Sequence, residues 1–299
     1  MQLSGSIRKI RQAWLVYGFF GVVEEIFIRR TCWSIKDYSI DAKGKETSIS
    51  DQNSYVQLCE LAVANQGVFS KFRRCLEYRL ILEHVTKRFG KQYLDIAVRN
   101  SDVLDYYDRI KIQNSIGNPV TFRYKKIGRT SPTTLRYLKV LVDLIELFGP
   151  LDNKVISEIG VGFGGQAHAI AVNQNIQKYL LFDLPPVLEL NKKFLGAVGN
   201  IDKFEFIDGR NPSERSSDLL ISNYAFSELN REVQLMYLER VIPNAKMGYI
   251  TWNELSYKQL GGLSVEELLE RIPGSILKPE RPLTYANNVM IVWGIRQGQ

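Results

Sequence analysis

The stretch VISEIGVGFGGQAH, residues 155–168, lies near the middle of a chain of 299 residues. An apolar run leads into four closely spaced glycines, and helix-forming residues follow them. This order predicts a buried strand, a tight turn and a helix. Because glycine has no Cβ, such a turn lets the backbone approach a ligand closely. We therefore expect an α/β fold with a ligand at the end of this strand.

The glycines fit two fingerprints at once. Gly160, Gly162 and Gly165 match the G-x-G-x-x-G of dinucleotide sites, whereas Glu158, Gly160, Gly162 and Gly164 match the E-x-G-x-G-x-G of class I methyltransferases. A dinucleotide brings a negatively charged pyrophosphate to the turn, and a carboxylate two residues before the first glycine opposes it. S-adenosylmethionine carries no phosphate, and an acid at Glu158 can orient its ammonium group. The acid therefore favours S-adenosylmethionine as the cofactor.

The strand pattern after the first 150 residues supports the same choice. Strand-like runs alternate with helical stretches, which predicts a parallel sheet. The predicted strands are 154–160, 179–183, 204–208, 218–223 and 247–252, and the predicted helices are 165–175, 187–197, 230–242 and 264–272. Two further runs, 274–278 and 288–295, have no helix between them and must pair antiparallel. Seven strands ending in a hairpin form the Rossmann-like sheet of class I methyltransferases, whereas the dinucleotide fold keeps a helical crossover to its sixth strand.

Polar residues end the other predicted strands where a nucleoside would bind. Asp183, followed by Leu184, ends the second strand and is expected to hold ribose hydroxyls. Asp208, followed by Gly209, ends the third strand, where an adenine amino group would lie. Together with Glu158, these acids end three consecutive strands, which favours a cofactor site over isolated helix caps.

Three segments carry a resemblance to a known family: 158–165, 182–187 and 221–229 (ISNYAFSEL). Together they resemble the sugar O-methyltransferases, a bacterial family of class I S-adenosylmethionine enzymes. Segments 130–137 and 248–253 extend the resemblance to about residues 115–260. It implies an S-adenosylmethionine-dependent O-methyltransferase that acts on a hydroxyl of a sugar or saccharide-containing acceptor. It also places Ser222 and Asn223, at the end of the fourth strand, beside the cofactor.

Methyl transfer to a hydroxyl is an in-line displacement that needs a general base. Plant-type O-methyltransferases, which this chain is similar to at Asp183-Leu-Pro, place a histidine base after the fourth strand, where this chain has Asn223 and Tyr224. We therefore expect Glu228 to be the base and Tyr224 to position the acceptor. His168 and Glu254 are further candidates.

A magnesium-assisted reaction stays open. Asp208, Glu228 and Glu254 could supply oxygen ligands, but no spacing signal for a metal site is present and we predict none.

The front half of the chain is basic. Residues 1–150 carry 24 Lys and Arg against 15 Asp and Glu. No nucleic-acid-binding motif accompanies these charges, so we expect no nucleic acid partner. A basic front half favours an acceptor that carries phosphate or carboxylate, whether free, nucleotide-linked or lipid-linked. Arg123, Lys125, Lys126 and Arg129 are the residues predicted to recognise it.

Residues 1–128 are predicted to form an N-terminal helical domain, and 129–299 the methyltransferase domain. Helices are expected through 7–30, 53–64, 70–89, 90–108 and 131–148, with a polar loop at 41–51. The apolar run 13–23, preceded by basic residues, is too short to span a bilayer. Residues 7–30 are therefore expected to dock on a second copy in a homo-oligomer or to lie on a membrane surface. Three irregularly spaced cysteines suit a reducing compartment, so a cytoplasmic location is predicted, peripheral to the inner membrane if the helix binds it.

Three other functions compete with this interpretation. The first is a nicotinamide oxidoreductase, which Glu158 and the terminal hairpin disfavour. The second is an O-methyltransferase of a small non-sugar natural product. The third is a catalytically silent methyltransferase-like module that docks on a partner or membrane.

Overall fold

The computed structural model describes residue 26 and residues 28–35, 53–199, 201–255 and 260–295. The helix and membrane contact expected through residues 7–30 lie almost wholly outside the described residues, as does the polar loop at 41–51. Within the described part of the chain, no helix is long and apolar enough to cross a membrane.

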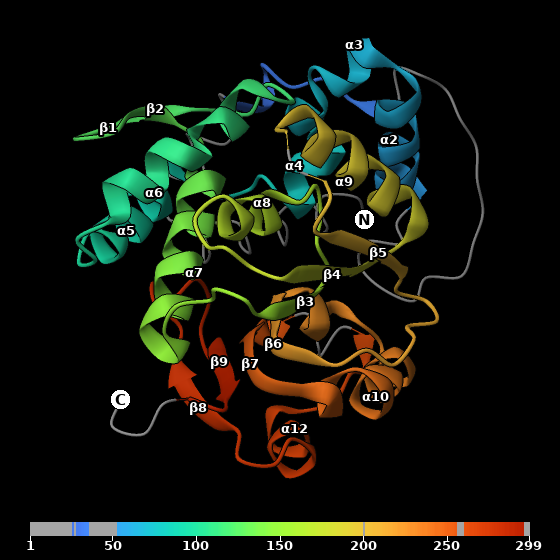
Figure 1. Cartoon of the computed structure of the whole chain (residues 1–299). Helices are drawn as coiled ribbons and strands as arrows, with labels where there is room; N and C mark the ends of the chain where they lie inside the picture. Colours follow the sequence, from blue (N-terminus) through green and yellow to red (C-terminus); the bar gives the residue numbers. More distant parts are fainter. Residues whose placement is uncertain (1–25, 27, 36–52, 200, 256–259, 296–299) are drawn as a thin grey trace, which may run out of the picture.

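A seven-stranded sheet forms the centre of the molecule (Figure 1), with the order β5-β4-β3-β6-β7-β9-β8. Its strands are β3 (Val155–Ile159), β4 (Lys178–Asp183), β5 (Phe204–Asp208), β6 (Ser217–Asn223), β7 (Ala245–Trp252), β8 (Ile276–Pro279) and β9 (Val289–Trp293). The five strands β3 to β7 run parallel, while β9 pairs antiparallel with both β7 and β8. This is the predicted class I methyltransferase sheet with its terminal hairpin, so the fold class is confirmed.

The strand order reverses between β3 and β6, because the chain first builds outward to β5 and then returns to the other side of β3. At such a reversal the loops after the two strands diverge and leave a crevice at their carboxyl ends. The fold thus places a ligand site where the glycine turn and the residues after β6 meet.

Helices cover both faces of the sheet. Buried residues of α7 (Pro132–Phe148), α8 (Gly165–Ala171) and α9 (Pro185–Ala197) pack with the N-terminal helices on one face. Buried residues of α10 (Arg231–Arg240) and α12 (Val265–Arg271) pack on the other face. The short helix η6 (Ile242–Asn244) follows α10 and leads into β7. The first helix of the set, α7, begins as predicted, because the Ser131 side chain accepts a hydrogen bond from the Thr133 N–H at 3.2 Å.

The N-terminal part is helical but more divided than predicted. It contains α2 (Asn53–Ala64), α3 (Gln66–Phe69), η3 (Phe72–Arg74), α4 (Leu76–Ile81), α5 (Lys87–Ala97), α6 (Val103–Ile110) and η4 (Lys111–Ser115). The predicted single helices 70–89 and 90–108 are wrong. Cys75 has an extended backbone (φ −69°, ψ 134°), and Thr86 caps a new helix by accepting the Phe89 N–H. A short hairpin of β1 (Phe122–Tyr124) and β2 (Gly128–Thr130) follows.

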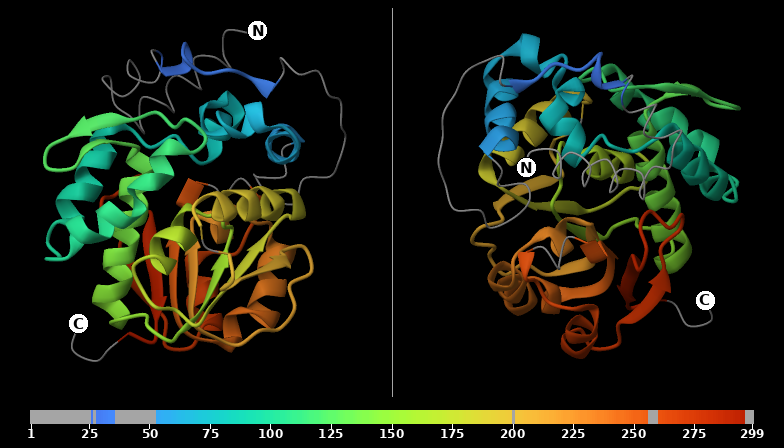
Figure 2. Two further views of the ribbon diagram at one scale, coloured as in Figure 1. Left: turned by 45° about the horizontal axis from the view of Figure 1, so that its top comes forward. Right: turned by 180° about the vertical axis from the view of Figure 1, so that it is seen from behind.

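The N-terminal helices lie against the sheet domain rather than apart from it (Figure 2). One continuous cluster of buried apolar residues runs from α2 through α7 to the strands β3 and β4. The division at residue 128 stays a prediction, and the shared core means that α4 and the loop after it are held over the strand ends.

Candidate active site

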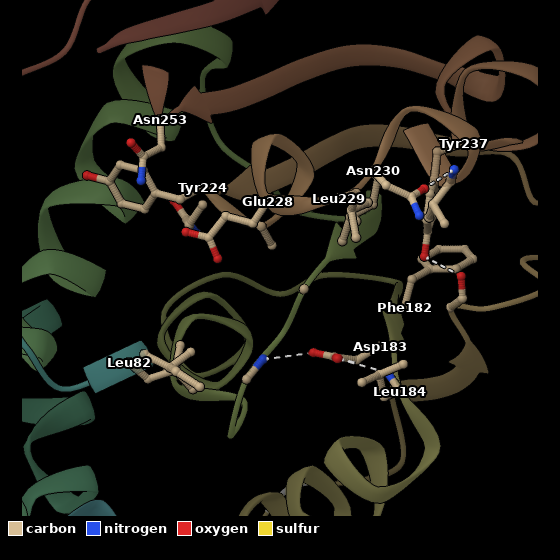
Figure 3. Close-up of a pocket in the computed structure, with 18 of the residues that line it drawn as sticks. Leu82, Phe182, Asp183, Leu184, Tyr224, Glu228, Leu229, Asn230, Tyr237 and Asn253 are labelled. Atoms are coloured by element: carbon tan, nitrogen blue, oxygen red, sulfur yellow. Dashed lines mark hydrogen bonds between the residues drawn. The ribbon is translucent and has the colours of Figure 1, made fainter. Parts of the chain in front are cut away.

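A cavity of about 790 Å³ opens at the carboxyl ends of β3, β4 and β6, where the strand order reverses. Residues of α10 and the turn after β6 form one side, and residues of α4, α5 and α7 form the other. This volume lies in the range of small-molecule sites. The cavity is therefore the candidate active site, and Figure 3 shows it from inside.

The glycine turn forms part of the cavity wall and is packed too closely for side chains. Gly160 has φ 76°, and a Cβ there would lie 2.0 Å from the Cβ of Ala225. Gly162 has φ 54°, and a Cβ there would lie 2.9 Å from Leu82 Cδ1. The left-handed backbone and the close neighbours both require glycine at these two positions.

Asp183 holds this turn against the end of β4. One carboxylate oxygen accepts the Gly162 N–H at 3.1 Å, and the other accepts the Leu184 N–H at 2.8 Å (Figure 3). The Asp183 carbonyl accepts the Gly209 N–H at 2.8 Å, and Tyr237 donates its hydroxyl to the Gly209 carbonyl at 3.0 Å. This part of the cavity is built from residues 160–162, 183–184, 209 and 237. We call it the donor end, because the sequence predicts that the methyl donor binds here. Most of its polar contacts involve main-chain groups.

Four of the predicted cofactor residues lie outside the cavity wall: Glu158, Gly164, Asp208 and Ser222. Glu158 is buried behind the wall, where it accepts the Tyr179 hydroxyl at 2.8 Å and where burial raises its pKa to about 8. Asp208 is partly exposed, and Arg210 binds it at 2.7 Å and lowers its pKa. The Ser222 hydroxyl donates to the Ile159 carbonyl at 3.1 Å, which ties β6 to β3. These residues support the wall, while Gly160, Gly162, Asp183, Leu184, Gly209 and Asn223 line it.

Glu228, Tyr224 and Asn253 form the opposite part of the cavity, which we call the acceptor end (Figure 3). Glu228 is the last residue of the short 3-10 helix η5 (Ala225–Glu228), which follows β6. Burial raises the pKa of its carboxyl to about 6, while the charge of Arg136 and a hydrogen bond with Asn253 act in the opposite direction. A carboxyl with this pKa is ionised at neutral pH and can still accept a proton, so it suits a general base.

Tyr224 is held rigidly beside Glu228. Its φ of 69° lies in the left-handed region, which is uncommon for an aromatic residue. Its N–H donates to the Thr251 carbonyl at 3.0 Å, and its hydroxyl donates to Glu280 at 2.5 Å. Because the hydroxyl is already engaged, the exposed part of Tyr224 offers the cavity mainly its ring.

His168 and Glu254, the other candidate bases, do not line the cavity. His168 is buried in α8, where its Nδ1 lies 2.8 Å from Gln113 Nε2 and burial lowers its pKa to about 4. The Glu254 N–H donates to the Asn288 side chain at 3.1 Å. No group of three His, Cys, Asp or Glu side chains suited to a metal occurs in the described part of the chain.

His84 and Arg136 also line the cavity, although no sequence pattern predicted a role for either residue. Three nitrogens on these walls are buried without a hydrogen-bond partner among the described residues: His84 Nδ1, Arg136 Nε and Asn223 Nδ2. Leaving such a group unpaired costs about 1–3 kcal/mol. Because all three lie on one cavity, they are candidate contacts for a ligand. His84 is one of only two histidines in the chain, and this rarity was the signal available in the sequence.

Comparison with known proteins gives structural likenesses only. No family model matches the sequence, and no curated protein does. An rRNA methylase from Streptococcus thermophilus is 18% identical over 51% of this chain and 91% of its own, with a TM-score of 0.37. The pyocyanin biosynthetic protein PhzM is 12% identical over 68% of this chain and 70% of its own, with a TM-score of 0.40. PigF, solved with SAH, is 18% identical over 46% of this chain and 55% of its own, with a TM-score of 0.38.

Proposed function

We propose that this protein is an S-adenosylmethionine-dependent O-methyltransferase that acts on a hydroxyl of a sugar or saccharide-containing acceptor. The observation that carries the proposal is the position of Glu228. A half-buried carboxyl with a pKa raised to about 6 faces the same cavity as the glycine turn. The two requirements of O-methylation, a donor site and a base, thus lie on one cavity within a methyltransferase fold.

The residues at the donor end fit S-adenosylmethionine. Gly160 and Gly162 keep side chains out of the space beside the wall, and Asp183 stands at the end of β4, where ribose hydroxyls would be held. Asn223 Nδ2 is a buried donor without a partner among the described residues, and a carboxylate or hydroxyl of the ligand would satisfy it. When bound, S-adenosylmethionine supplies an activated methyl group. The protein has only to position the acceptor, exclude water and remove a proton.

Glu228 would remove the proton from the acceptor hydroxyl as the new oxygen–carbon bond forms. The hydrogen bond with Asn253 orients its carboxyl, and the charge of Arg136 keeps it ionised at neutral pH. The apolar side chains Leu82, Val85 and Phe89 line the cavity on the N-terminal side and would keep water away from the reacting groups there. The N-terminal helices would thus act as a fixed cover over the reaction.

The assignment of a sugar as the acceptor rests on the resemblance to sugar O-methyltransferases. The alternative acceptor is a small non-sugar natural product. The apolar residues that line the cavity favour it: Ile81, Leu82, Val85, Phe89 and Met236. A catalytically silent module would not need a half-buried base beside an intact glycine turn. Homo-oligomerisation remains a prediction.

Calorimetric titration with S-adenosylhomocysteine tests the donor site. We expect binding to the wild-type protein and its loss in Gly162→Arg, whose side chain would enter the space beside Leu82. A labelled-methyl assay on a panel of saccharides and small phenols then identifies the acceptor class. Tight binding of NADH without any binding of S-adenosylhomocysteine would overturn the proposed function.

A further inference from the structure

Arg136 is the buried cation of the cavity wall. It lies in the first turns of α7, and the residue is 7% exposed. Its guanidinium carbon lies 5.6 Å from the ring centroid of Tyr137 and 5.9 Å from that of Tyr224. Aromatic rings attract a cation weakly, and Tyr137 also forms a side-chain hydrogen bond with Arg136, but neither ring supplies the carboxylate that a guanidinium prefers.

No carboxylate of the described residues forms an ion pair with Arg136. Glu280 borders a small void beside Arg136, but its oxygens accept hydrogen bonds from the Tyr224 hydroxyl and from Thr284. Glu228 is near enough for the Arg136 charge to act on it, but it too forms no ion pair. Arg136 Nε has no hydrogen-bond partner among the described residues. Because a buried charge is stabilised by a directly bonded anionic partner, this part of the cavity favours an anionic group on the ligand.

The neighbouring charges limit what this anion can be. Burial holds the other nearby basic group, His84, at a pKa of about 4, so that it is neutral at pH 7. Arg136 therefore contributes one positive charge beside Glu228, which must be ionised to act as a base. Each negative charge that a ligand brings beside ionised Glu228 opposes the ionisation of Glu228, and a carboxylate brings one such charge where a phosphate dianion brings two. A carboxylate also matches the two-pronged geometry of the guanidinium.

We propose that Arg136 binds the carboxylate of the acceptor, so that the substrate is a hydroxy acid, such as a sugar acid, whose hydroxyl faces Glu228. This inference rests on the proposed function and names the substrate class of the same site. The inference also replaces the earlier expectation that basic residues of the β1–β2 hairpin bind the anionic group of the acceptor. Arg123, Lys125, Lys126 and Arg129 do not line the cavity, and Arg129 instead donates to the Thr121 carbonyl at 3.1 Å.

Matched pairs of ligands test the inference. Glucuronate, galacturonate and quinate would be titrated calorimetrically against glucose, galactose and inositol, with glucose 6-phosphate as the phosphate probe. Each titration would be run with and without saturating S-adenosylhomocysteine. The proteins are the wild type, Arg136→Gln, Arg136→Lys and the control Arg129→Gln. Thermal unfolding of each variant would be recorded as well.

We expect at least one carboxylate to bind the wild type while its neutral counterpart does not. Arg136→Gln should weaken that binding by about 10- to 100-fold, and Arg136→Lys, which keeps the charge but loses the planar fork, by about tenfold. Arg129→Gln should bind like the wild type. Because Arg136→Gln removes an unpaired buried charge, its melting temperature should not fall, whereas a purely structural arginine would lower it on removal.

The inference is overturned if none of the carboxylates binds the wild type, if Arg136→Gln binds them equally well, or if glucose 6-phosphate alone binds. If Arg136→Gln does not fold, the binding of carboxylates to Arg136→Lys still tests the inference. Failure of the proposed function is recognised separately, because S-adenosylhomocysteine would then not bind any of the four proteins.

Discussion

The two ends of the cavity are built in different ways. At the donor end, the Asp183 carboxylate accepts main-chain N–H groups of Gly162 and Leu184, and the Asp183 carbonyl accepts that of Gly209. At the acceptor end, side chains from residues 82–86, α7 and the turn after β6 meet, and two of their nitrogens, His84 Nδ1 and Arg136 Nε, are buried without close partners among the described residues. Apart from Asn223 Nδ2, the donor end is therefore largely complete in itself, whereas the acceptor end has two buried nitrogens that a ligand would satisfy.

This contrast predicts how each end responds to substitution. Changes at the donor end should damage the protein as well as ligand binding, because the same contacts shape the turn. Changes at the acceptor end should remove chemistry while leaving the fold and donor binding intact.

Gly160→Val should have the largest effect. The new Cβ would lie 2.0 Å from Ala225, in a backbone conformation that a β-branched residue strongly disfavours. We expect binding of S-adenosylhomocysteine to be lost and the free energy of unfolding to fall by about 3 kcal/mol, as measured by calorimetry and urea unfolding. The control is Gly196→Ala in α9, where nothing lies within 4 Å of the added Cβ. Equal behaviour of the two variants would show that the turn does not shape the donor site.

Glu228→Gln should have the next largest effect, confined to turnover. Loss of the general base is expected to lower kcat by about 10²- to 10³-fold, while the Kd for S-adenosylhomocysteine changes less than about twofold. In the wild type, kcat/KM should rise as the pH passes about 6, because Glu228 must lose its proton before it can act. This ascending limb should disappear in the variant.

The matched control is Glu254→Gln, a carboxyl of the same type that does not line the cavity. It should retain turnover within a few fold. If Glu254→Gln is inactive and Glu228→Gln is active, the base has been assigned to the wrong carboxyl.

Asp183→Asn should weaken binding of S-adenosylhomocysteine by about 10- to 100-fold. The amide would present an NH₂ group to main-chain N–H donors that now face two carboxylate oxygens. Asp208→Asn serves as the comparison, since Arg210 holds the Asp208 side chain outside the cavity wall. We expect Asp208→Asn to change the Kd by less than about threefold in calorimetric titration. A larger loss in Asp208→Asn than in Asp183→Asn would reverse the roles of the two acids.

The same contrast explains how much the sequence revealed. The fold and Asp183 were predictable because strand periodicity, the glycine spacing and the terminal hairpin are local patterns with fixed spatial consequences. His84 and Arg136 belong to no such pattern. They reach the cavity because α4 and α7 pack over the strand ends, and that packing depends on a core shared by distant segments. The predicted helix through 70–89 hid the break at residues 82–86 that brings His84 to the wall.

Glu158→Gln should have the smallest effect on ligand binding, with a change in Kd of less than about threefold, because the side chain lies behind the cavity wall. Its effect should appear in the pH dependence of stability. Burial raises the pKa of Glu158 from 4.5 to about 8, so the folded protein binds this proton more tightly than the unfolded chain does. The stability that the proton provides is present in full below pH 4.5 and is lost as the pH rises through about 8.

Glutamine has no proton to lose and still accepts the Tyr179 hydroxyl, so the variant should lack this loss. We expect urea unfolding at pH 5, 7 and 9 to show that the wild type loses stability relative to Glu158→Gln, by on the order of a few kcal/mol across that interval. Parallel stability curves would mean that Glu158 is ionised in the folded protein at neutral pH. The acid of the glycine fingerprint would then carry a charge next to the donor end, as the sequence motif first indicated, and the donor end would be less complete in itself than its hydrogen bonds imply.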